Sequence, residues 1–292
     1  MTHLHHAALG SSRSSVLLTL ILVLTALVYL KGWLSVRFSH VKRTSARRAF
    51  SFLAGITLIW VAVASPIAAL DHELLTVHML QHLLLMTLAP PLIWLGAPAS
   101  GGLPRRFAGN MLVSLWRSHT ARSFAAALGR PEFAWLAACG ALVGWHIPIF
   151  FSLGMQSTPW HLFEQLFFLA TGLLFWRPVV QPAAGRDLSM ILYLFFATLP
   201  CDILSGLLVF SDRVVYPMYF SSSHLLGFSP LVDQQCAAAL MWTCVTVVYL
   251  VAGAMLTMRV LSPQGSSEVG LVQPTLRGTG IGPDVSQGLG AI

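Results

Sequence analysis

Seven long apolar stretches run through this 292-residue sequence and constrain its fold more than any other feature. A helix needs about 20 mostly apolar residues to cross the hydrocarbon core of a bilayer. Two of the stretches are shorter and need flanking residues to span it. The pattern predicts an all-α polytopic integral membrane protein with seven transmembrane helices, at residues 14–30, 49–70, 74–95, 133–153, 160–176, 188–210 and 236–258.

The amino-acid composition excludes a soluble protein. Only 9% of the residues are charged and 56% are hydrophobic, whereas soluble domains carry about 25% charge. So few charges could not cover the surface of a soluble protein of this size without leaving large apolar areas in water. The sequence also lacks a glycine-rich phosphate loop, a G-x-S-x-G motif and an H-E-x-x-H motif. We therefore expect a membrane protein that is not an enzyme.

The basic residues predict how the chain is oriented. They lie after the first, third and fifth stretches and after the last one, and the opposite side holds only Arg13 and Arg213. Loops rich in Lys and Arg stay on the cytoplasmic side of a membrane. This places the N-terminus outside and the C-terminus in the cytoplasm. The net charge of +7 thus reflects topology, so we expect membrane lipids as partners and no nucleic acid.

The pattern divides the chain into three parts. Residues 1–13 form an outer N-terminal segment, and residues 14–261 form the seven-helix domain, with basic cytoplasmic loops at 31–48 and 97–132. Residues 262–292 are rich in Gly, Pro and Ser and contain no aromatic residue, which predicts a disordered cytoplasmic tail.

Histidines and acids inside the predicted helices are the candidates for chemistry, because ionisable groups in a membrane usually have a partner or a function. His78 and His82 are four residues apart and therefore lie on one face of the third helix. A rise of about 1.5 Å per residue places them roughly 6 and 12 Å below the outer surface. The same arithmetic places Asp202, in the sixth helix, at about the depth of His82.

Three further candidates lie at the outer ends of other helices. His161 and Glu164, three residues apart, begin the fifth helix, and His146 ends the fourth. Histidine and carboxylate with methionine nearby suit copper or another transition metal. A ligating histidine usually donates its second ring nitrogen to a carboxylate, a role for Asp202 or Glu164.

The same residues admit other roles. The polar side chains could hydrogen-bond across helices and hold the bundle together, or form a proton path. Haem stays open, because His82 could pair across it with His146 or His161 on a facing helix. Retinal is excluded, because it needs a lysine within a helix for its Schiff base and both lysines lie in a predicted loop.

Four sequence blocks resemble one known family. They are HMLQHLLLMTLAPPLIWLGAP (78–98), HLFEQLFFLATGLLFWRPVV (161–180), LPCDILSGLLVFSDRVVYP (199–217) and DQQCAAALMW (233–242). Over residues 65–258 the chain is similar to the CtaG-like cytochrome c oxidase assembly factors, the membrane-embedded type linked to caa-type oxidases.

The resemblance implies a seven-helix protein of the bacterial plasma membrane that helps form active cytochrome c oxidase, at the step of copper delivery or metal-centre formation. Cytochrome c oxidase subunits are then the expected partners. The matching positions are His78 and His82, His161 with Glu164, and Asp233 with Gln234. The chain departs from the family pattern at Gln165, Asp202 and Cys236.

Two other classes of function stay open at this point. One is a membrane transporter for copper or a small substrate. The other is a membrane redox protein linked to haem or quinone.

Overall fold

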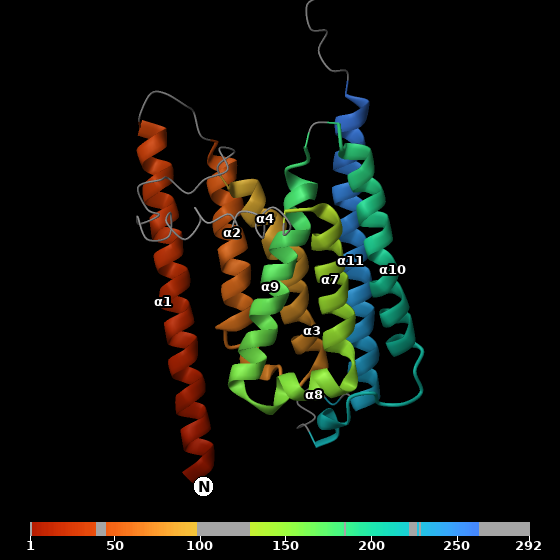
Figure 1. The fold of residues 1–292 in the computed structure, drawn as a ribbon. Coiled ribbons are helices and arrows are strands. Elements are labelled where there is room, and N and C mark those ends of the chain that lie inside the picture. The colour runs from red at the N-terminus through yellow and green to blue at the C-terminus, as the bar shows by residue number, and fades with distance from the viewer. Residues whose placement is uncertain are drawn as a thin grey trace, which may run out of the picture.

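The computed structural model describes residues 2–38, 45–97, 129–183, 185–221, 227 and 229–262, and these residues form helices and connections but no strand. Most of the predicted loop 97–132 and nearly all of the predicted tail 262–292 lie outside this described part. The elements, in chain order and as labelled in Figure 1, are α1 (Thr2–Phe38), α2 (Ala46–Val63), η1 (Ala68–Leu70), α3 (Leu75–Leu83), η2 (Leu84–Leu88), α4 (Ala89–Gly96), α7 (Pro131–His146), α8 (Pro148–Gln156), α9 (Thr158–Val180), α10 (Asp187–Val209), η3 (Pro217–Ser221) and α11 (Pro230–Leu261).

The helices form an all-α bundle of a multi-pass membrane protein (Figure 1). Within the described residues, five helical segments are long and apolar enough to cross a bilayer: Ser15–Ser35, Ala46–Leu70, Leu75–Gly96, Asp187–Val209 and Pro230–Leu261. Each overlaps a predicted stretch. The first helix begins at Thr2, so residues 2–13 of the predicted outer segment are part of the same helix as the first candidate span.

The fourth predicted stretch is not one straight helix. α7 and α8 meet at an angle of 80°, and together they make a sixth candidate span. The break follows from Pro148, because the residue before a proline is restricted to extended backbone. Ile147 has φ −65° and ψ 127°, as this rule requires. α8 therefore lies across the lower end of the bundle in Figure 1.

The fifth predicted stretch forms α9, a helix of 23 residues within the bundle. It does not reach the apolarity of the other spans, because its first half contains His161, Glu164 and Gln165. All three side chains are buried among neighbouring helices. Seven spans thus stay a prediction, with five or six supported by length and composition.

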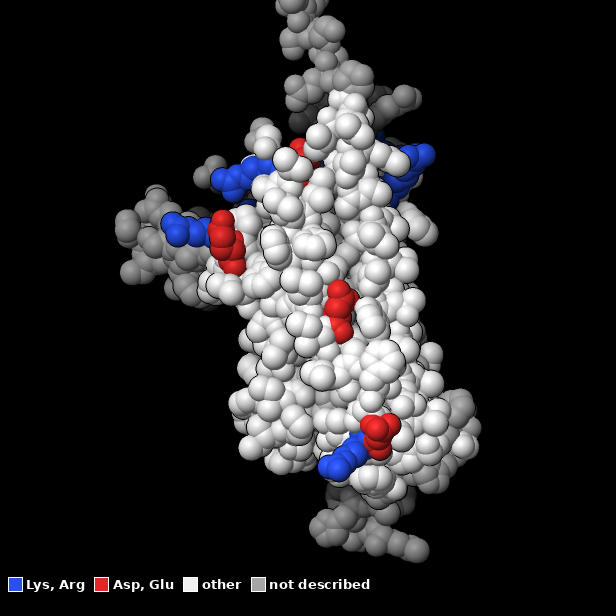
Figure 2. Space-filling model, turned by 90° about the vertical axis from the view of Figure 1, so that its right-hand side faces the viewer, with Lys and Arg blue, Asp and Glu red and all other residues white. Residues whose placement is uncertain are grey.

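Charged side chains separate along the bundle. The described Lys and Arg residues other than Arg13 and Arg213 belong to the ends of helices at the upper end in Figure 1: Lys31, Arg37, Arg47, Arg48, Arg130, Arg177, Arg186 and Arg259. Figure 2 shows one face on which blue side chains lie toward the two ends, with a mostly white band between them. Buried histidines and acids instead gather toward the end opposite the basic one.

The elements α3, η2 and α4 form one continuous central helix, and its middle part, η2, is π-helical. η2 joins α3 to α4 just before Pro90, which has no N–H to donate to the Met86 carbonyl. The Trp176 indole on α9 donates to that carbonyl at 3.1 Å instead. Gly172 allows this approach, because a Cβ there would lie 2.7 Å from the Met86 oxygen. These contacts fix how α9 is rotated against the central helix.

Candidate metal centre

Three buried side chains from two helices converge on one point. His78 and His82 of α3 bring their Nε2 atoms to 2.8 Å from each other. Oε1 of Glu164 on α9 lies 3.8 Å from the first of these nitrogens and 3.6 Å from the second. The exposed fractions of the side chains are 1%, 8% and 1%. One ligand atom from each residue therefore fits around a single metal ion.

Three polar atoms in this group are buried without a hydrogen-bond partner. They are Nδ1 of His78, Nδ1 of His82 and Oε2 of Glu164. An ionised carboxylate removed from water is costly unless a cation lies beside it. A metal ion between the two Nε2 atoms and Oε1 would supply that positive charge, so the donor set fits a transition metal such as copper.

A second group lies nearer the end of the bundle. It contains Asp71 and His72, between η1 and α3, and His161 of α9. Nδ1 of His161 lies 3.4 Å from Asp71 Oδ2, and Nε2 of His72 lies 3.8 Å from Asp71 Oδ1. The His72 side chain is 56% exposed, whereas Asp71 is buried. This group thus has one ligand residue at the surface and two below it.

The two groups are in direct contact. The rings of His161 and His78 stack with centroids 5.5 Å apart. Gln81 donates to Asp71 Oδ2 at 3.1 Å, and Gln165 donates to Gln81 at 3.4 Å. Ligand side chains therefore follow one another from the exposed His72 to the buried pair.

His146 continues this series on the other side of His82. The two ring centroids are 6.4 Å apart. Nδ1 of His146 donates to the Leu142 carbonyl at 2.6 Å, and Nε2 lies 3.2 Å from the sulfur of Met79. His146 is the last residue of α7, and the break before Pro148 follows directly after it.

The start of α3, which carries both histidines of the buried pair, is held by another helix. Leu74 provides no side-chain cap. The Asp233 carboxylate of α11 instead accepts from the backbone N–H groups of Leu75 and Thr76, at 2.6 and 3.1 Å, and from the Thr76 hydroxyl at 2.6 Å. These bonds satisfy donors that a helix leaves free at its N-terminus.

Two tyrosines of the α10–α11 connection hydrogen-bond to the backbone of candidate ligand residues. Tyr219 donates to the Asp71 carbonyl at 2.8 Å, and Tyr216 donates to the His146 carbonyl at 2.9 Å. Burial raises the pKa of both phenols above the usual value. They therefore stay neutral and act as donors over the whole physiological pH range.

The structure brings together His78, His82, His161, Glu164 and His146, which are five of the six candidates from the sequence. Asp202 is not among them. It lies half-buried on α10, and in the described part of the chain no metal-ligand group includes it. Glu164 faces the Nε2 atoms and not the Nδ1 atoms, so its position fits a third ligand and not an orienting partner.

Sequence patterns did not identify Asp71, His72 and Met79 as site residues. Their neighbours in space come from α9 and α7. The close spacing of Asp71 and His72 to the His78–His82 pair is the one signal in the sequence that pointed to them.

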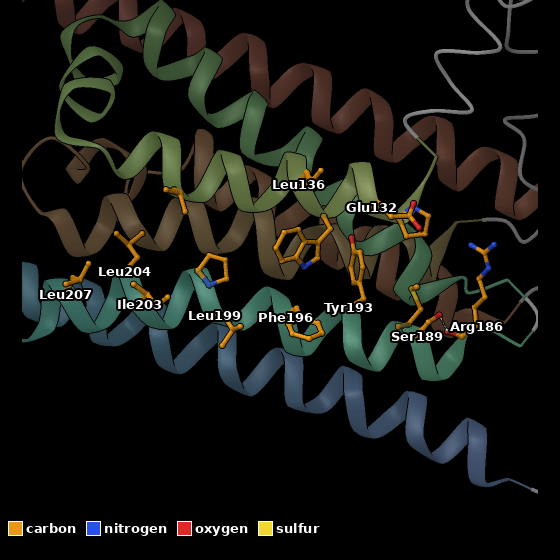
Figure 3. A pocket seen from close by; sticks show the side chains of 15 residues that line it. Glu132, Leu136, Arg186, Ser189, Tyr193, Phe196, Leu199, Ile203, Leu204 and Leu207 are labelled. Carbon is orange, nitrogen blue, oxygen red and sulfur yellow. Dashed lines mark hydrogen bonds between the residues drawn. The ribbon is translucent and has the colours of Figure 1, made fainter.

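A separate groove of about 1030 Å³ lies between α7 and α10 (Figure 3). Its wall is mostly apolar, and Glu132, Arg186 and Ser189 lie together at one end, with Leu207 at the other. Apolar lining is expected where a helix pair faces lipid. None of the candidate ligand residues lines this groove.

The fold and site define a helical membrane protein in which buried histidine and carboxylate side chains converge. Residues 27–262 match the family described as cytochrome c oxidase caa3 assembly factor (Caa3_CtaG). The match covers most of the chain, so the protein belongs to that family. Comparison with curated proteins found no match. Comparison with solved structures also found none.

Proposed function

We propose that this protein helps to form the metal centre of cytochrome c oxidase by holding copper transiently at His78, His82 and Glu164. The family description supports a role in oxidase assembly. Copper is the cargo, and the three side chains hold it until it is passed to the oxidase. The protein itself has no catalytic role.

One observation carries this proposal: two imidazole nitrogens 2.8 Å apart share a carboxylate oxygen in a buried position. Hydrogen bonding between helices explains this arrangement less well. The bond between the two rings joins residues of the same helix and leaves the Glu164 carboxylate buried 3.6 and 3.8 Å from the Nε2 atoms with no cation beside it, although a buried carboxylate is costly without one. A metal ion bound to the two Nε2 atoms and to Oε1 would explain why these atoms lie close together, and it would balance the charge of the carboxylate.

The position of the second group supports loading from the outside. His72 is exposed, and Asp71 and His161 lie between it and the buried pair. All of them lie toward the end opposite the basic helix ends. Because Lys- and Arg-rich ends stay in the cytoplasm, the opposite end faces outward. In this proposal it is the outer face of the bacterial plasma membrane.

The first test measures copper in the purified full-length protein. We expect about one copper per chain at this site, and its loss in the His78→Ala, His82→Ala double variant. A wild type that holds no more copper than the double variant would refute the ligand assignment.

The second test deletes the gene and measures oxidase activity and the copper content of the oxidase. We expect both to fall and to recover partly when copper is added. Unchanged oxidase would favour transport, which vesicles lacking oxidase would reveal as copper flux. A visible spectrum with an intense Soret band would favour haem instead.

A further inference from the structure

We propose that a second metal site, specific for Cu(I), lies beyond the histidine pair, in a sulfur-lined cavity at the centre of the bundle. This inference rests on the proposed function, because it takes copper to be the cargo. It adds a soft-ligand site that the family description does not contain.

The cavity has a volume of about 30 Å³ and lies among α3, η2, α7, α9, α10 and α11. About 10–15 Å³ is enough for one water molecule, so the space accommodates a single ion or water but not a haem or a quinone. Five of these elements, all except α9, contribute a sulfur-bearing residue to the wall. The sulfur-bearing residues of the wall are Met79, Met86, Cys139, Cys201 and Met241.

Two of the histidines described above also line the cavity. His82 is one of them, and its Nε2 atom belongs to the pair with His78. Its Nδ1 atom is buried without a hydrogen-bond partner. The same imidazole is therefore part of the histidine–carboxylate group and of the cavity wall.

The second histidine shows the clearest sign of a missing cation. Nδ1 of His146 donates its proton to the Leu142 carbonyl at 2.6 Å, so Nε2 of the neutral ring carries only a lone pair. This lone pair faces the Met79 sulfur at 3.2 Å, and a thioether has no proton to donate. Two electron donors thus face each other with no hydrogen between them, an arrangement that a bound cation would stabilise.

The donor set selects one oxidation state of copper. Thioether and thiol ligands are soft and favour Cu(I), whereas imidazole with carboxylate also suits Cu(II). A cavity walled by methionine and cysteine with one or two imidazoles therefore takes Cu(I). Its position next to His82 makes it the next binding site for an ion that leaves the His78–His82 pair.

The test uses the purified full chain in detergent, titrated anaerobically with Cu(I) against a chromophoric Cu(I) chelator, together with X-ray absorption of the bound metal. We expect sulfur scatterers around Cu(I) in the wild type. Met79→Leu should weaken Cu(I) binding at least tenfold, and combining it with Met86→Leu and Met241→Leu should weaken it further and lower the number of sulfur neighbours around the metal. Met and Leu have similar volumes, so folding should be preserved, which the thermal midpoint checks.

Two further variants make the result specific. Met190→Leu is the matched control, because Met190 is equally buried but lines the groove between α7 and α10. It should leave Cu(I) binding unchanged. Glu164→Gln should lose copper at the histidine–carboxylate site and keep the Cu(I) sulfur signal.

Two outcomes would overturn this inference: a wild type that binds no Cu(I), or one whose Cu(I) has only nitrogen and oxygen neighbours and is unaffected by the methionine changes. Neither outcome touches the proposed function, which fails separately if deletion of the gene leaves the copper content of the oxidase unchanged.

Discussion

The carboxylate of Glu164 fills the space that a side chain at Gly154 would need. A Cβ at that glycine would lie 2.5 Å from Oε2 of Glu164. α8 therefore packs against the carboxylate that faces the two histidines, and a glycine is required there for close approach and not for an unusual backbone angle. The broken helix α7–α8 thus contributes directly to the shape of the candidate metal centre.

Gly154→Ala tests this contact. We expect the new methyl group to push the carboxylate away from the histidine nitrogens and to lower copper affinity about tenfold or more. The thermal midpoint should change little, because the displaced atom is at the end of a flexible side chain. Gly140→Ala in α7, where a Cβ meets nothing within 4 Å, is the control and should keep full copper binding.

Glu164→Gln keeps the size of the side chain and removes its charge. We expect copper at the histidine pair to fall at least tenfold, because a buried metal loses its one anionic ligand. Metal analysis of the purified protein measures this. Asp202→Asn is the comparison, and it should retain copper, since Asp202 joins no ligand group in the described part of the chain. Equal losses in both variants would contradict the ligand set.

Asp233→Ala removes the acceptor that holds the start of α3. We expect a loss of about 1.5–3 kcal/mol in the free energy of unfolding, since buried hydrogen bonds to a charged group are broken. Asp233→Asn keeps one acceptor oxygen and should have an intermediate effect. Thermal unfolding in detergent measures both, with Asp212→Asn on the exposed α10–α11 connection as the control. An unchanged midpoint in Asp233→Ala would show that α3 does not depend on this cap.

Gly172→Ala tests the approach of α9 to the π-helical segment. The added Cβ would lie 2.7 Å from the oxygen and 2.8 Å from the Cα of Met86. Because these are backbone atoms, the helices must move apart, and overpacking of this kind costs about 1–3 kcal/mol. Gly206→Ala, where nothing lies within 4 Å, should be neutral or slightly stabilising by about 0.4–1 kcal/mol. The difference between the two thermal midpoints is the measurement, and no difference would mean that the helices tolerate the separation.

Much of this architecture could be predicted from local sequence. Apolar length alone located the helical segments, because a span must satisfy its backbone inside lipid. The spacing of four residues placed His78 and His82 on one helix face, and the structure keeps them together. The basic residues predicted which helix ends lie on the same side of the membrane. In the described residues these ends lie together at one end of the bundle.

Other features needed the tertiary structure. Counting residues along a helix predicts depth, and on that basis Asp202 was expected level with His82. Depth does not determine how a helix is rotated about its axis. That rotation is set by packing, for α9 by Gly172 and Trp176 against the Met86 backbone.

The sequence by itself determined the helical membrane class, the approximate spans and the pairing of His78 with His82, because each depends on residues close together in the chain. Only the tertiary structure decided that Glu164 completes this pair while Asp202 does not, and that His146 faces Met79. Contacts between side chains of separate helices depend on helix rotation and on breaks such as that at Pro148. Both are set by packing across the whole bundle.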